Sequence, residues 1–243
     1  GVRWVEETDM TAYWQRIGAD KLPDVMKLEA ERMHLLDIED ETFLPERDVV
    51  REERRLRIET QPISKFFENL VKTHFQVSPY SQPVIGSAEE IMSFTLADAR
   101  RWYAEHYAPN NALLIVVGAV KAEDVFALAQ QYYGPIPKAK VPTRYLPSEP
   151  FFKHPRVLDK IDVQIEGQLF YRIYRAPSVF AGVAGAPAPN MKTPVTLMLL
   201  ASALGDSSKG YLYRTLVEEQ KIATAASLDY SGVAHSETTI DLY

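Results

Sequence analysis

The strongest structural signal in this chain is the segment Pro45-Glu46-Arg47-Asp48-Val49-Val50-Arg51-Glu52-Glu53-Arg54-Arg55. Helical spacing would place Glu46 and Glu53 two turns apart on one face, with Val49 and Val50 beside them. A solvated helix that pairs its glutamates with its arginines remains an open interpretation of this pattern. The valines favour a partly buried face, on which a carboxylate needs a counter-charge, and a metal ion is the strongest one.

Regular periodicity continues on both sides of this segment. Pro23 suits the first turn of one helix, Pro62 interrupts the next, and Thr95 with Asp98 forms a capping-box-like start of a third. The expected helices cover about residues 22–36, 45–59, 62–71, 95–107, 125–132 and 193–205. Apolar runs predict strands at about 112–117, 163–165, 169–174, 228–231 and 238–242.

Proline is concentrated between residues 134 and 155, which hold six of the 16 prolines and show no helical or alternating period. We therefore expect residues 1–133 to form one domain, 134–155 a linker and 156–243 a second domain. Helices and strands recur on both sides of this linker. The sequence thus predicts an α+β protein made of two related units.

Composition excludes several classes of function. A formal charge of -6 argues against nucleic-acid binding, which needs clustered cations. The absence of cysteine excludes disulfides, thiolate nucleophiles and cysteine-ligated zinc, so a metal site must use His, Asp or Glu. The longest apolar stretches are far shorter than the ~20 residues that cross a bilayer. Both ends of the chain have the look of cut ends, with no leader before Gly1.

The histidines do not form a metal motif. The closest two of the five, His74 and His106, are 32 residues apart, so no pair shares a helix face. A self-contained H-E-x-x-H or H-x-x-E-H site is therefore absent from the chain. G-x-S-x-G, P-loop and G-x-G-x-x-G motifs are also absent. We interpret the histidines as caps or boundary residues.

The pattern Glu46-Arg47-x-x-Val50-x-x-Glu53, preceded by Leu28-Glu29-Ala30-Glu31-Arg32-Met33, resembles the segment that follows the inverted H-x-x-E-H motif of pitrilysin/insulinase zinc metallopeptidases. The resemblance covers essentially the whole chain. Further segments follow the family's order and spacing: Ser78-Pro79-Tyr80, Phe94-Thr95-x-x-Asp98, Tyr107-x-Pro109-Asn110-Asn111, Tyr133-Gly134-Pro135-Ile136-Pro137, and Leu204-Gly205 with Ser207-Ser208-x-Gly210.

The resemblance implies roles for two residues. Glu53 matches the third zinc ligand, and Glu46 matches an acid two turns earlier that supports catalysis. The two histidine ligands and the general-base glutamate have no counterpart here, and the family spacing would place them roughly twenty to thirty residues before Gly1. We therefore expect a truncated chain that is inactive alone and binds Zn²⁺ weakly or not at all, whereas its intact parent is a zinc endopeptidase.

The resemblance also implies an architecture and partners. It predicts two α/β-roll units with mixed or antiparallel sheets and helices packed on one side, both incomplete at the chain ends. The second unit would be a non-catalytic peptidase-like domain. Expected partners are a peptide substrate, a second peptidase-like half that is fused or separate, and another copy of the chain; nucleic acid and membrane are not expected. The compartment stays open between periplasm and cytoplasm, with the periplasm favoured by the family.

One alternative remains. The family also contains non-catalytic homologues that bind or scaffold an active peptidase subunit. The sequence before Gly1 discriminates between the two hypotheses, because H-x-x-E-H there favours the enzyme.

Overall fold

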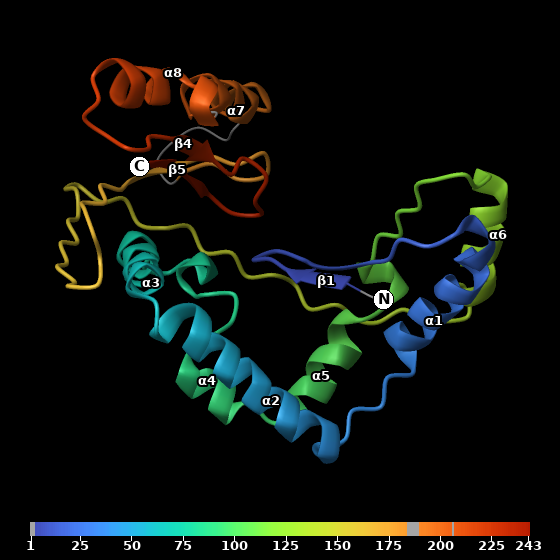
Figure 1. The fold of residues 1–243 in the computed structure, drawn as a ribbon. Coiled ribbons are helices and arrows are strands. Elements are labelled where there is room, and N and C mark those ends of the chain that lie inside the picture. The colour runs from blue at the N-terminus through green and yellow to red at the C-terminus, as the bar shows by residue number, and fades with distance from the viewer. Residues whose placement is uncertain (1–2, 184–189, 206) are drawn as a thin grey trace. The chain divides into compact units, whose positions relative to one another are not determined.

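The computed structural model describes residues 3–183, 190–205 and 207–243, and it combines helices with short antiparallel strands. This confirms the α+β class. The chain forms two compact units (Figure 1). Unit 1 consists of Gly1–Arg55 and Ile85–Arg144, and unit 2 of Leu56–Val84 and Tyr145–Tyr243. Residues 56–84 therefore group with the second half of the chain, whereas the peptidase-domain bounds at residues 133 and 156 stay a prediction.

Unit 1 is mainly helical. Its strands β1 (Arg3–Glu6) and β2 (Thr11–Trp14) form an antiparallel hairpin in which Val5 pairs with Ala12. Its helices are α1 (Leu22–His34), α2 (Asp40–Arg54), α4 (Ala88–Ser93), α5 (Leu96–His106) and α6 (Ala122–Tyr132).

Local sequence explains where the helices of unit 1 begin. Pro23 lies in the first turn of α1, as predicted. The capping box at α5 is also confirmed: the Asp98 N–H donates to Thr95 Oγ1 at 3.2 Å, and the Thr95 N–H donates to Asp98 Oδ2 at 3.1 Å. A second capping box, which was not predicted, pairs Ser87 with Glu90 at the start of α4.

Polar contacts fix α5 against α1 and β2. The Tyr103 hydroxyl donates to the carbonyl oxygen of Arg32 at 2.7 Å and accepts from the Leu36 N–H at 3.2 Å. One turn later, the hydroxyls of Tyr107 and Tyr13 lie 2.6 Å apart. Tyr103 of α5 and Tyr107, the residue after the helix, therefore hold the end of α1 and the hairpin in place, and burial raises the pKa of Tyr103.

The strand predicted at residues 112–117 does not form, although the segment connects α5 to α6 as expected. It joins no ladder within the described residues, and Leu113 and Val117 are 84% and 93% exposed. An apolar run becomes a strand only when a neighbouring strand takes up its N–H and C=O groups. The sequence of this segment is typical of a buried strand, but the described residues provide no partner strand for it.

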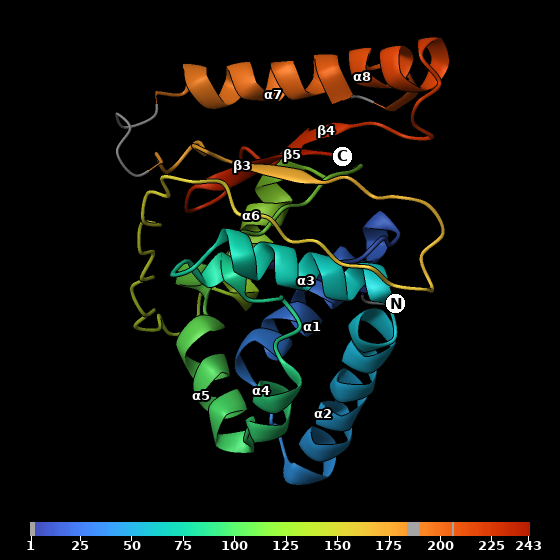
Figure 2. The same ribbon diagram turned by 90° about the vertical axis from the view of Figure 1, so that its left-hand side faces the viewer.

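Unit 2 contains a three-stranded antiparallel sheet in the order β3-β5-β4. The strands are β3 (Arg172–Ala176), β4 (Leu228–Tyr230) and β5 (Thr238–Leu242). Helices α7 (Lys192–Gly205) and α8 (Tyr211–Tyr213) lie on one side of this sheet (Figure 2), and α3 (Pro62–His74) packs its Phe67 ring edge-on against Tyr171.

Several element bounds differ from the prediction. The helix expected from Pro45 begins at Asp40, so Pro45 lies inside it and leaves one backbone hydrogen bond of the helix unmade. Its last part, Arg55–Glu59, is a π-helical turn. The strand expected at 163–165 is a turn, and β3 begins three residues later than the run at 169 suggested. The β1–β2 hairpin was not predicted.

Two aspartates face each other across β4 and β5. Asp229 is the register partner of Asp241, and like charges in such positions repel. Thr239 Oγ1 donates to Asp241 Oδ2 at 3.0 Å, whereas the buried Asp241 Oδ1 has no hydrogen-bond partner among the described residues. Burial, together with the nearby Asp229, raises the pKa of Asp241 to about 6, although the Thr239 bond lowers it.

This arrangement predicts that unit 2 becomes more stable as the pH falls. The Asp241 carboxyl has a higher pKa in the folded state than in the unfolded state, so its protonation stabilises the folded state. This stabilisation is complete below the unfolded pKa of ~3.9 and is lost as the pH rises through 6. Asp241→Asn should remove this dependence and raise the free energy of unfolding at pH 8 by about 1–2 kcal/mol, a figure reduced for partial exposure. Urea unfolding at pH 5 and pH 8 measures it. If the free energy of unfolding changes equally with pH in the wild type and in Asp241→Asn, the raised pKa does not belong to Asp241.

Candidate functional site

The two glutamates singled out in the sequence both lie in α2, Glu46 in its middle and Glu53 in its last turn. Seven residues of helix separate their Cα atoms by about 10 Å along the axis and about 20° around it. Glu46 is exposed and Glu53 is half-buried. This arrangement is compatible with one ligand and one supporting acid.

The packed side of α2 lies next to the glutamates. It consists of Phe43, Arg47, Val50 and Arg54, spaced at helical intervals. The Phe43 ring lies 5.8 Å from the Phe94 ring, and Arg54 Nη1 donates to the Gly86 carbonyl oxygen at 2.6 Å. The arginines of the motif thus attach α2 to the α4 region, and Glu46 and Glu53 border this packed side.

The expected burial of both valines is only half right. Val50 is half-buried, but Val49 is 56% exposed. Val49 lies about 100° from Val50 around the helix, on the side away from the packed residues. Glu46 therefore lies beside an exposed valine. Of the residues expected on a partly buried face, only Val50 and Glu53 are half-buried.

Glu52 is paired with Arg55, as the solvated-helix interpretation of this segment expects. Arg55 Nε donates to Glu52 Oε2 at 2.8 Å, and Arg55 Nη2 donates to Oε1 at 2.6 Å. This bond to Arg55, which outweighs the small effect of desolvation, lowers the pKa of Glu52. An exposed, paired carboxylate next to Glu53 makes Glu52 a matched control for mutagenesis.

The residues of this chain do not fit a complete zinc centre. Protein zinc sites use three or four ligands from Cys, His, Asp and Glu. Within the described residues, no group of three such side chains could hold a metal ion. Helix α2, which carries Glu53, contains no histidine.

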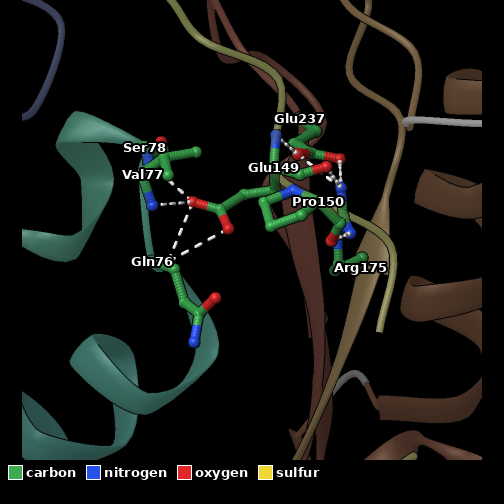
Figure 3. Close-up of polar contacts among 7 residues, drawn as sticks. All are labelled: Gln76, Val77, Ser78, Glu149, Pro150, Arg175 and Glu237. Carbon is green, nitrogen blue, oxygen red and sulfur yellow. Dashed lines mark hydrogen bonds and ion pairs between the residues drawn. The ribbon is translucent and has the colours of Figure 1, made fainter. Parts of the chain in front are cut away.

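A second carboxylate cluster, in unit 2, had no signal in the sequence (Figure 3). Glu149, from the proline-rich linker, is 0% exposed. Its Oε1 accepts hydrogen bonds from the backbone N–H groups of Gln76 at 2.9 Å, Val77 at 2.7 Å and Ser78 at 2.5 Å. Burial alone would raise the pKa of Glu149, but these donors and Arg175 outweigh it and lower the pKa.

Arg175 of β3 completes this cluster. Its Nη2 donates to Glu237 Oε1 at 2.6 Å and to the Glu149 carbonyl oxygen at 3.0 Å, and its Nη1 donates to the Pro150 carbonyl oxygen at 2.7 Å (Figure 3). Glu237, which is 1% exposed, also accepts from the Glu149 N–H at 2.8 Å. Both carboxylates are hydrogen-bonded within unit 2, although the buried Arg175 Nε has no hydrogen-bond partner among the described residues. We interpret the cluster as structural.

Comparison with known proteins identifies the family. Residues 93–239 match the family model described as the Peptidase M16 inactive domain, and the chain belongs to this family. The match includes the linker with Glu149, and also Arg175 and Glu237, but it includes neither residues 76–78 nor α2. The roles of Glu46 and Glu53 therefore remain a proposal.

Two curated relatives extend the comparison. The zinc protease PqqE of Helicobacter pylori is 29% identical over 226 residues, which cover 90% of this chain and 47% of that protein. Cytochrome b-c1 complex subunit 1 from human mitochondria is 28% identical over 127 residues, covering 52% of this chain and 26% of that protein. The chain thus spans about half, or less, of the length of these relatives.

A solved structure shares the fold. The crystal structure of a protease from Helicobacter pylori matches with a TM-score of 0.80 and 25% identity, covering 100% of this chain and 56% of that one. The family match, together with a relative named as a zinc protease, identifies the family as one of zinc metallopeptidases. No helix in the described part of the chain has the length and apolarity to cross a membrane.

Proposed function

We propose that this chain is part of a zinc-dependent endopeptidase that hydrolyses peptides, with Glu53 as the third zinc ligand and Glu46 as a supporting acid. The other two ligands and the general base would come from residues outside this chain. Residues 156–243 would form part of a non-catalytic peptidase-like domain that pairs with the metal-site domain, and a second such half, fused or separate, would enclose the substrate.

The observation that carries this proposal is the similarity to a zinc protease over 90% of the chain, which includes α2. The structure supports the assignment of roles, because Glu53 is half-buried at the edge of the packed side of α2 while Glu52 is exposed and bound by Arg55. Zinc as the cofactor and the periplasm as the compartment are parts of the same proposal.

A second candidate function is that of a non-catalytic binding or scaffolding subunit. The similarity to cytochrome b-c1 complex subunit 1 favours it, since that relative is named as a subunit of a larger complex. The coding sequence upstream of Gly1 separates the two candidates. An H-x-x-E-H motif there supports the peptidase, and a sequence of homologous length without the motif supports the scaffold.

The purified 243-residue chain is expected to show no zinc-dependent peptidase activity and only weak zinc affinity. One carboxylate ligand without imidazoles or a general base neither holds zinc tightly nor activates water. Cleavage of a quenched fluorescent peptide library, with and without chelator, and zinc titration measure both properties. A characterised zinc peptidase serves as the positive control, and chelator-sensitive cleavage by the chain itself would refute the prediction.

A further inference from the structure

Helix α2 ends on a buried arginine. Arg54, in the last turn of the helix, is 7% exposed, and it directly follows Glu53, the proposed zinc ligand. Arginine is rarely this buried unless its guanidinium group is paired, because burying a charge without partners is costly. The contacts of this guanidinium group therefore decide how the last turn of α2 is held.

The guanidinium group of Arg54 binds the turn that precedes α4. Its Nη1 donates to the Gly86 carbonyl oxygen at 2.6 Å. Gly86 has a φ of +78°, which residues with a side chain rarely adopt, and the next residue, Ser87, is the N-cap of α4 in a capping box with Glu90. The turn and the capped helix start together constrain the backbone on both sides of this carbonyl group, so Arg54 is attached to a fixed point.

The helical geometry changes immediately after Arg54. Residues Arg55–Glu59 form a π-helical turn, which holds more residues than a turn of α-helix. Successive residues of an α-helix are rotated by about 100° around its axis, so a shift of the point at which α2 ends would redirect the side chain of Glu53. The hydrogen bond between Arg54 and Gly86 lies at this point, one residue from Glu53.

We propose that Arg54 is a positioning residue for Glu53. By binding the Gly86 carbonyl oxygen, its guanidinium group fixes the rotation of the last turn of α2 and so directs the Glu53 carboxylate toward the metal. This inference rests on the proposed role of Glu53 as a zinc ligand. Residues behind a metal ligand orient it, and they affect both metal affinity and activity. Arg54 acts through the helix backbone and touches neither the metal nor the substrate.

A role of Arg54 in stability alone makes a different prediction. Replacing a buried arginine that only attaches α2 to the α4 region would lower the free energy of unfolding but leave the zinc affinity of the folded protein unchanged. Replacing a positioning residue lowers the zinc affinity of the folded protein as well. Zinc binding measured at a temperature at which each variant is folded, as monitored by circular dichroism, therefore separates the two roles.

The test uses a longer protein that contains this chain and an H-x-x-E-H motif. Arg54→Met keeps the apolar part of the side chain but removes its donors, and it should raise the zinc dissociation constant by about 10- to 100-fold. The kcat of peptide hydrolysis should fall while KM stays within about twofold, because the substrate contacts are unchanged. Arg54→Lys keeps a charged donor without the planar fork, so it should recover part of the loss and bind zinc about 3- to 10-fold more weakly than wild type.

Arg55→Met is the matched control, because Arg55 is the adjacent arginine, is exposed and binds Glu52. This variant should bind zinc within about twofold of wild type. Wild-type zinc affinity in both Arg54 variants, while Glu53→Gln has lost zinc, overturns the positioning role and leaves the proposed function intact. If Glu53→Gln also retains zinc, the proposed ligand is wrong and the positioning role falls with it.

Gly86→Ala tests whether Arg54 acts through the Gly86 carbonyl group. An added Cβ would lie 3.8 Å from Glu90 Oε2, an ordinary contact, so the substitution acts through the φ of +78° that alanine disfavours. It should displace the carbonyl oxygen and raise the zinc dissociation constant by about 3- to 10-fold. Combined with Arg54→Met, it should cause no further loss, because both changes remove the same hydrogen bond. If the two effects multiply, Arg54 does not act through Gly86 and the proposal is wrong.

Discussion

Glu149→Ala is expected to destabilise unit 2 by about 3–5 kcal/mol, the cost of breaking a buried, hydrogen-bonded charge cluster. The substitution leaves the N–H groups of Gln76, Val77 and Ser78 without their carboxylate acceptor. Glu149→Gln should cost less, because the amide keeps one acceptor oxygen but loses the charge. Urea unfolding measures the stability, and hydrogen exchange at residues 76–78 measures the local effect.

Glu166→Ala provides the control for this experiment. Glu166 is an exposed glutamate of the same unit, so its replacement should change the free energy of unfolding by no more than ~0.5 kcal/mol. Amides 76–78 should exchange faster only in the Glu149 variants. If Glu149→Ala unfolds at the same urea concentration as wild type, the cluster contributes no net stability and our interpretation of it is wrong.

Local features were predictable from sequence where neighbouring residues determine them. The Thr95–Asp98 capping box, the Glu52–Arg55 pair and the helix that ends at Gly205 all depend on residues within one or two turns. The Glu149 cluster was not predictable, because it joins residues 76–78, 149, 175 and 237, and no periodicity links positions so far apart.

The prediction of a strand at residues 112–117 was wrong for a related reason. Its composition is typical of a buried strand, but strand formation depends on a partner elsewhere in the fold, which a single sequence does not reveal. The candidate site shows the same limit. Helical spacing correctly placed Glu46 and Glu53 on α2, whereas the exposure of Val49 depended on where α4 packs.

The second prediction with a large expected effect concerns Glu53 and Glu46 in a longer protein that also contains an H-x-x-E-H motif. Glu53→Gln should lower zinc affinity and peptidase activity together, each by more than about 100-fold, because a ligand is lost rather than a group behind a ligand. Glu46→Gln should lower turnover by about 10- to 100-fold while most of the zinc stays bound. Peptide hydrolysis at saturating zinc separates the two, since added metal should partly restore Glu53→Gln but not Glu46→Gln.

The assignment of Glu53 is tested most directly by the zinc content of that longer protein in its Glu53→Gln and Glu52→Gln variants, measured by mass spectrometry after dialysis. Glu52 is the adjacent glutamate, exposed and paired with Arg55, so its replacement should leave the zinc content unchanged. Our account predicts that Glu53→Gln loses zinc and Glu52→Gln retains it. Retention of zinc by Glu53→Gln together with its loss from Glu52→Gln would contradict the account.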